Sequence, residues 1–130
     1  MSRKWYGIVG SRGFTNKQLV IDFVKSIKHP NGIVSGGCKN SPDQYAEEEA
    51  IGRKLSRVIF EPHWSPSPGK INKGAAFERN KEIAAFCDVL VAFYDGSSNG
   101  TKHVMEEAKK LGKRVIVFDA DGNHSDYESS

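Results

Sequence analysis

Short apolar runs alternate along this chain with longer segments in which apolar residues recur at helical spacing. The runs that predict strands are residues 5–9, 33–34, 58–60, 89–94 and 114–118. The segments that predict helices are roughly residues 15–27, 42–52, 72–86 and 101–111. Such alternation is typical of βαβ units with a parallel sheet. We therefore expect an α/β fold, a three-layer α/β/α Rossmann-like doubly wound sheet with about five parallel strands.

The residues at the helix ends support this assignment. Thr15 and Gln18 have the spacing of a capping box ahead of the first helix. Ser41 followed by Pro42 is a strong start for the second helix, because serine caps helices and proline suits the first turn. Gly112 is the natural residue after the end of the fourth helix.

A chain of 130 residues has the size of one ordinary domain. We expect residues 1–118 to form this domain as a ligand-binding unit. Residues 119–130 are polar and acidic, and we expect them to fray as a C-terminal tail.

Composition and charge limit the binding partners and the cellular location that we expect for this protein. The 19 basic and 16 acidic residues are spread along the chain and give a net charge of +3, so nucleic acid is disfavoured as a partner. Cys38 and Cys87 form no C-x-x-C pair, which is typical of a reducing compartment and gives no zinc-site spacing. No apolar run approaches the ~20 residues that cross a bilayer, and no signal-peptide pattern opens the chain. We expect a cytoplasmic protein without a membrane partner or a metal site.

Three glycine-rich loops follow strands, where ligands bind in open parallel sheets. They are residues 10–13, 35–37 and 96–101. Glycine lets the backbone approach a ligand, and a helix N-terminus behind it attracts an anion. Tight turns also use glycine, but three such loops at one edge favour a phosphate site. None matches the phosphate loop of NTPases or a clean dinucleotide-binding fingerprint.

The order and spacing of several short motifs resemble a known family. The motifs are Gly10-Ser11-Arg12, the stretch from Val34 to Asp43, the pair Arg79-Asn80, the run from Asp88 to Phe93, and Gly100-Thr101. They resemble the SLOG superfamily, and more narrowly its small single-domain branch related to YspA and YpsA. The resemblance covers nearly the whole chain to Phe118. It implies a Rossmann-like domain that binds nucleotides or nucleotide-derived signals such as ADP-ribose and NAD derivatives.

Wider relatives by this resemblance are the LOG phosphoribohydrolases and the DNA-processing protein DprA. The LOG signature is similar to Pro-Gly-Gly-x-Gly-Thr-x-x-Glu, with a catalytic glutamate at its end. Here Val104 stands three residues after Thr101, and Glu107 lies one helical turn further on. This departure puts the phosphoribohydrolase mechanism in doubt.

The loops and the resemblance together give a set of expected ligand-binding residues. They are Gly10, Ser11, Arg12, Ser35, Gly36, Gly37, Asp43, Trp64, Arg79, Asn80, Gly96, Gly100 and Thr101.

Several of these side chains have two interpretations. Arg12 is either a bidentate phosphate clamp or a solvated loop residue. Asp43 either complements a helix dipole or accepts a ribose hydroxyl, and only the resemblance favours the second role. Arg79 needs a partner for its charge, either a ligand phosphate or a carboxylate such as Asp43. Thr101 can cap the fourth helix and also bind phosphate. Trp64 either stacks on a base or covers the core.

The leading functional hypothesis is a sensor or sequestering domain for a small nucleotide ligand, with no other cofactor expected. One alternative is a hydrolase of N-glycosidic or phosphate bonds, for which Asp43, Glu47 and Asp95 are the candidate acids or bases. No two of them are convincingly paired, so enzymatic activity stays open. A second alternative is nucleic-acid binding of the DprA type. Homo-oligomer formation is also left open.

Overall fold

The computed structural model describes residues 3–62 and 74–127. Its helices are α1 (Lys17–Ser26), α2 (Pro42–Gly52), α3 (Ala75–Phe86) and α4 (Asn99–Lys110). Its strands are β1 (Trp5–Gly10), β2 (Gly32–Ser35), β3 (Ser56–Ile59), β4 (Val89–Phe93), β5 (Arg114–Phe118) and β6 (His124–Asp126). Helices and parallel strands alternate as the sequence predicts.

The six strands form one sheet in the order β3-β2-β1-β4-β5-β6. β1 to β5 run parallel, and β6 pairs antiparallel with β5. The chain leaves β1 toward β2 and β3 on one side and later returns to place β4 on the other side of β1. Ligands of open α/β sheets bind at such a switch point, beyond the carboxyl ends of the two strands. The expected Rossmann-like α/β fold is therefore confirmed.

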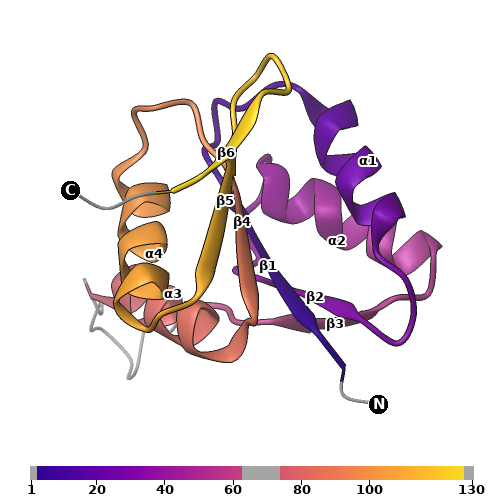
Figure 1. The fold of residues 1–130 in the computed structure, drawn as a ribbon, viewed down its shortest axis with the longest axis horizontal. Coiled ribbons are helices and arrows are strands. Elements are labelled where there is room, and N and C mark those ends of the chain that lie inside the picture. Colours follow the sequence, from indigo (N-terminus) through magenta and orange to yellow (C-terminus); the bar gives the residue numbers. More distant parts are fainter. Residues whose placement is uncertain (1–2, 63–73, 128–130) are drawn as a thin grey trace, which may run out of the picture.

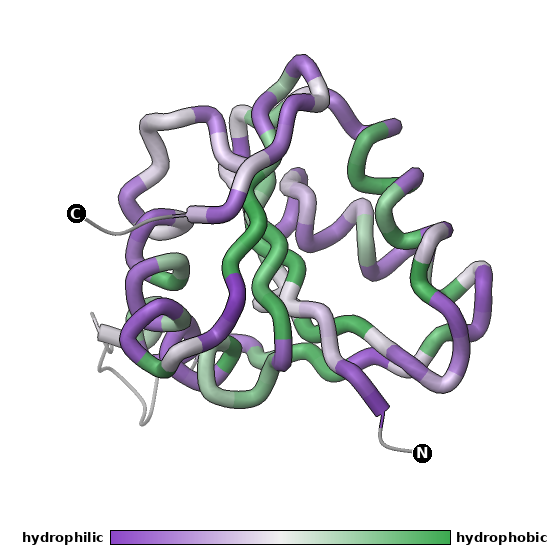
Figure 2. Tube along the Cα trace, in the orientation of Figure 1, coloured by the Kyte–Doolittle hydropathy of each residue, from purple (hydrophilic) through white to green (hydrophobic). Residues whose placement is uncertain are grey.

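Helices cover both faces of the sheet, α1 and α2 on one face and α3 and α4 on the other (Figure 1). Neighbouring residues of β1 point to opposite faces, as successive side chains of a strand do. Ile8 packs with the buried residues of α1 and α2, whereas Val9 packs with those of α3 and α4. The apolar strands run through the middle of the molecule, with polar segments mostly on the outer helix surfaces (Figure 2). Two apolar cores, one on each face of the sheet, therefore fix the position of the strands and of their carboxyl ends.

Several predicted boundaries were wrong. The first helix begins at Lys17 and its cap is Asn16, whose side-chain oxygen accepts a hydrogen bond from Leu19 N, so Thr15 does not cap it. The third helix begins at Ala75, after a turn at Gly74, and the expected start at Asn72 lies outside the described residues. The third strand ends at Ile59 instead of residue 60.

The C-terminal segment also differs from the expectation. Residues 124–126 do not fray but form β6, in which His124 pairs with Phe118 and Asp126 with Ile116. The side chains of β6 are exposed, so the strand carries no apolar pattern, and backbone pairing with the edge of β5 forms it. In the described part of the chain, no helix is long and apolar enough to cross a membrane.

Candidate functional site

A cavity of about 440 Å³ lies at the switch point, between the β1 and β4 ends and helices α3 and α4. The loop after β1 contributes Gly10, Ser11, Arg12 and Gly13. The loop after β4 and the start of α4 contribute Asp95, Ser97, Ser98, Gly100, Thr101 and Val104. Helix α3 contributes Ala76, Phe77, Arg79, Asn80 and Ile83, and Val9, Cys38 and Asp43 complete the wall. Two of the three glycine-rich loops therefore converge on one cavity.

The loop after β1 is fastened to the loop after β4. Ser11 is buried, its N–H donates to Phe93 O at 3.1 Å, and its hydroxyl oxygen accepts from Asp95 N at 3.3 Å. A Cβ at Gly10 would lie 2.3 Å from Pro42 Cγ, so only glycine allows α2 to begin so close to this loop. These contacts leave Arg12 exposed at the cavity wall, where its Nε donates to Cys38 Sγ at 3.4 Å.

The loop after β2 plays a different part from the one expected. Ser35, Gly36 and Gly37 do not line the cavity. Gly36 N donates to Asp43 Oδ2 at 2.9 Å, and Arg79 Nη1 donates to Gly36 O at 2.5 Å. This loop therefore anchors two residues of the cavity wall instead of contacting a ligand itself.

Asn80 joins α3 to α4 at the cavity wall, and Arg79 is bonded to Asn80 and to the loop after β2. Arg79 Nε donates to Asn80 Oδ1 at 3.0 Å, and Asn80 Nδ2 donates to Gly100 O at 3.3 Å. Asn80 Nδ2 also lies 3.2 Å from His103 Nδ1. Asn80 is buried, so these contacts satisfy an amide that would otherwise be costly there. The arginine charge is thus held at the cavity by polar contacts on both sides.

The N-terminus of α4 faces the same cavity. Ser98 is the N-cap, and its hydroxyl oxygen accepts from Thr101 N at 3.2 Å while its O–H donates to Thr101 Oγ1 at 3.0 Å. Ser98 therefore caps the helix, whereas the sequence suggested Thr101 as the cap. The free N–H groups and positive dipole end of a helix start favour an anion. Together with Arg12 and Arg79, they make this side of the cavity attractive to phosphate.

The candidate carboxylates have distinct environments. Burial raises the pKa of Asp43 to about 6, although the Gly36 N–H and the Arg79 charge oppose the shift. Burial and the carboxylates of Asp43 and Glu61 raise the pKa of Glu47 to about 7. The N–H of Ser97 lowers the pKa of the exposed Asp95.

These carboxylates are not brought together as a catalytic pair. Asp43 and Asp95 line the cavity, whereas Glu47 does not. Asp43 is engaged internally by Gly36 N and, at 3.4 Å, by the Ser41 hydroxyl. Within residues 3–62 and 74–127, no three His, Cys, Asp or Glu side chains lie close enough to hold a metal ion.

The cavity brings together most of the expected ligand-binding residues. They are Gly10, Ser11, Arg12, Asp43, Arg79, Asn80, Gly100 and Thr101. The residues that do not line it are Ser35, Gly36, Gly37 and Gly96. Trp64 lies outside the described residues.

Sequence reasoning missed Phe77 and Ser98. Phe77 is 50% exposed, lines the cavity from the first turn of α3, and meets the His103 ring edge-on at a centroid distance of 4.6 Å. Its position two residues before the Arg79-Asn80 pair was the available signal. Ser98 stands three residues before Thr101, the usual spacing for an N-cap that accepts from a backbone N–H.

Comparison with known proteins gives the family. No family model matches the chain. The Gene 61 protein of Mycobacterium phage D29 is 34% identical over 117 residues, which cover 85% of this chain and 93% of the phage protein. This chain belongs to the Gene 61 protein family.

Two solved structures share the fold of this Gene 61 family member. DNA processing protein A of Helicobacter pylori, described for its single-stranded DNA binding mode, has a TM-score of 0.74 and 23% identity. The match covers 90% of this chain and 66% of that protein. The molybdenum cofactor carrier protein of Chlamydomonas reinhardtii has a TM-score of 0.61 and 14% identity, with 90% of this chain and 77% of that protein covered. At these identities the likeness shows the fold.

These neighbours bear on two expectations from the sequence. Both support the expected Rossmann-like fold, while membership of the SLOG superfamily and of its YspA and YpsA branch stays a prediction. The expectation that nucleic acid is a disfavoured partner is wrong, because this fold serves single-stranded DNA binding in the H. pylori protein. Net charge was a poor guide here, since a small cavity needs only a few local cations.

Proposed function

We propose that this Gene 61 family member binds single-stranded nucleic acid and holds one nucleotide of the strand in the cavity at the switch point. The observation that carries this proposal is the convergence of Arg12, Arg79 and the N-terminus of α4 on one cavity. A guanidinium binds phosphate through charge-assisted hydrogen bonds, and a helix start offers free N–H groups. The fold shared with the H. pylori DNA processing protein supports a strand as the source of that phosphate.

The cavity also has an aromatic wall of the kind that single strands use. Phe77 exposes half of its surface beside Arg79, and His103 holds the ring at its edge. Base stacking on aromatic rings tolerates any sequence, because every base has a π-face. A cavity with phosphate-binding groups on one wall and an aromatic ring on another therefore suits a strand that is bound without base pairing.

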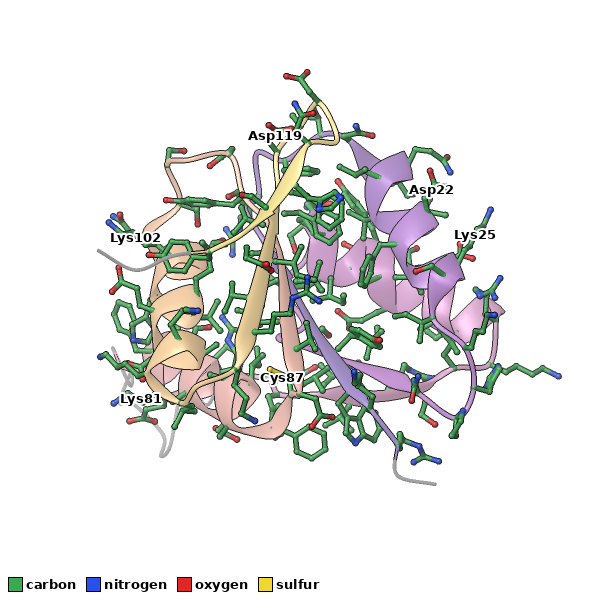
Figure 3. All side chains as sticks on the ribbon, viewed as in Figure 1. Asp22, Lys25, Lys81, Cys87, Lys102 and Asp119 are labelled. Carbon is green, nitrogen blue, oxygen red and sulfur yellow. The ribbon has the colours of Figure 1, made fainter. Side chains whose placement is uncertain are left out.

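The test is fluorescence anisotropy of a labelled thymidine homopolymer at two salt concentrations. Arg12→Ala is expected to weaken binding about tenfold and to flatten the salt dependence by about one released counterion. Lys25→Ala is the matched control, because Lys25 lies on α1, on the far side of the sheet from α4 and its Lys102 (Figure 3). Equal affinities of the Arg12 and Lys25 variants would contradict the proposal.

A free nucleotide is the second candidate ligand. A cavity of about 440 Å³ lies within the range that holds small molecules, roughly 300–1,000 Å³. The likeness to a cofactor carrier protein supports a small-molecule ligand as well. Competition separates the two candidates: AMP, NAD or ADP-ribose that displaces the labelled strand at micromolar concentration favours the free ligand. Displacement only at concentrations near those of inorganic phosphate favours the strand.

A further inference from the structure

Asp95 places a carboxylate in a cavity whose other charged walls attract phosphate. It stands two residues after the end of β4 and lines the cavity with Arg12 and Arg79. Its Oδ1 accepts from both the N–H and the hydroxyl of Ser97, each at 2.9 Å. These donors lower the pKa of Asp95, so the side chain is ionised at neutral pH.

The second oxygen of Asp95 is turned toward the loop after β1. A Cβ built on Gly13 would lie 3.2 Å from Asp95 Oδ2, so this oxygen faces the glycine that ends the Gly10–Gly13 loop. Among the described residues, no lysine, arginine or histidine forms an ion pair with Asp95. Two hydrogen bonds from Ser97 reach Oδ1, and the Ser11 hydroxyl and the Ser98 N–H also lower the pKa of this carboxyl. An ionised carboxylate has about four acceptor positions, so Oδ2 keeps room for a donor from a ligand.

A fixed negative charge at this place opposes phosphate binding unless it meets a different part of the ligand. A nucleotide carries such a part, because its base and sugar present N–H or O–H donors while its phosphate is acceptor-only. Asp43 was the sequence-based candidate for this role, but its oxygens are engaged by Gly36 N and Ser41 Oγ. Asp95 is the remaining carboxylate of the cavity wall.

We infer that Asp95 Oδ2 accepts a hydrogen bond from the base or the sugar of the bound nucleotide, and that the site thereby selects nucleotides that present a donor. This inference rests on the proposed function and adds a selection rule to it. Phosphate binds at the Arg12 and α4 side, and the donor group faces the Asp95 side. The polarity of the cavity then fixes the direction in which a nucleotide enters.

Asp95→Asn tests the inference with little change of shape. The amide oxygen can keep the Ser97 bonds, which turns the NH₂ group toward Gly13, so a ligand donor meets a donor. The loss of negative charge strengthens phosphate attraction, so a purely electrostatic role predicts tighter binding. The inference predicts the opposite, a loss of about tenfold in affinity for the strand that presents the donor, as for hydrogen bonds to charged groups. That strand is the thymidine homopolymer if the base supplies the donor, and a uridine ribohomopolymer if the sugar supplies it. Asp22→Asn on α1 is the matched control, and melting temperatures verify folding.

Modified strands identify the donor. If the base supplies it, a homopolymer of N3-methylthymidine binds the unaltered chain weakly, and Asp95→Asn changes that affinity little. If the sugar supplies it, a uridine ribohomopolymer binds more tightly than the deoxyuridine one, and Asp95→Asn removes the difference. Unchanged or tighter binding of all strands to Asp95→Asn would overturn the inference alone. Absence of strand binding by the unaltered chain would overturn the proposed function and this inference together.

Discussion

Arg79 on α3 lies directly against Gly36 at the end of β2. Its Nη1 donates to the Gly36 carbonyl oxygen, and a Cβ on Gly36 would come within 2.5 Å of the same nitrogen. Gly36 N donates in turn to Asp43 on α2. The backbone of Gly36 therefore links α3 on one face of the sheet to α2 on the other face. A side chain at this position would therefore crowd the Arg79 guanidinium.

Gly36→Ala is therefore expected to push Arg79 away from the cavity wall. Because the crowded atoms are the flexible end of the arginine, the expected cost is that of the lost hydrogen bond to Gly36 O, about 0.5–1.5 kcal/mol of unfolding free energy. Strand binding should weaken as well, because the guanidinium loses its anchor. Gly52→Ala is the matched control: a Cβ at Gly52, the last residue of α2, meets nothing within 4 Å. That substitution should stabilise the chain by about 0.5–1 kcal/mol. Chemical denaturation of both variants checks the pair, and equal stabilities would contradict the packing argument.

The contact between Gly36 and Arg79 illustrates which features of the fold and the site the sequence could predict. Apolar periodicity predicted five of the strands and all four helices, because core burial imposes that periodicity directly. Glycine content predicted three ligand loops, yet only two line the cavity. Close packing of Arg79 and close approach of a ligand require the same residue, so sequence cannot separate them. β6 was missed for a related reason, since its exposed side chains carry no pattern and its backbone pairs with β5.

Asn16, rather than Thr15, caps α1, and the two residues can be compared directly. Asn16 Oδ1 accepts from Leu19 N at 3.3 Å, and Asn16 Nδ2 donates to Ala120 O at 2.9 Å, which ties α1 to the loop before β6. Asn16→Ala is expected to cost about 1 kcal/mol, which lowers the melting temperature by roughly 4 °C in a chain of this size. Thr15→Ala should change it by less than half as much. A larger effect of Thr15→Ala would support the capping box and contradict the observed cap.

Glu47 gives the fold a dependence on pH. Burial beside Asp43 and Glu61 raises its folded-state pKa to about 7, well above the ordinary glutamate value of 4.5. A raised carboxylate pKa means that the folded chain binds the proton more tightly than the unfolded chain. This contribution is fully present below the ordinary pKa and is lost as pH rises through about 7.

Glu47→Gln should remove that dependence, because a neutral amide resembles the protonated acid. The variant is expected to match the unaltered chain near pH 5 and to exceed its melting temperature near pH 8. Glu48→Gln, at the exposed neighbouring position of α2, is the control and should leave the pH profile unchanged. Thermal denaturation across this range decides the matter: parallel profiles of the unaltered chain and Glu47→Gln would contradict the raised pKa.

The two cysteines should differ sharply in reactivity. Cys38 lies in the cavity wall within hydrogen-bonding distance of Arg12 and is partly exposed. Cys87 is fully buried between α3 and the sheet, and burial raises the pKa of its thiol to about 11 (Figure 3). Because the thiolate is the reactive form, a buried thiol with a raised pKa reacts slowly.

N-ethylmaleimide is therefore expected to modify Cys38 alone in the folded chain, as intact mass will show. The added group occupies the cavity beside Arg12, so the modified chain should lose most of its affinity for the thymidine homopolymer. Cys38→Ser keeps a small polar side chain at this place and should bind the strand before and after treatment. Full strand affinity of the modified, folded chain would place the bound strand elsewhere on the molecule.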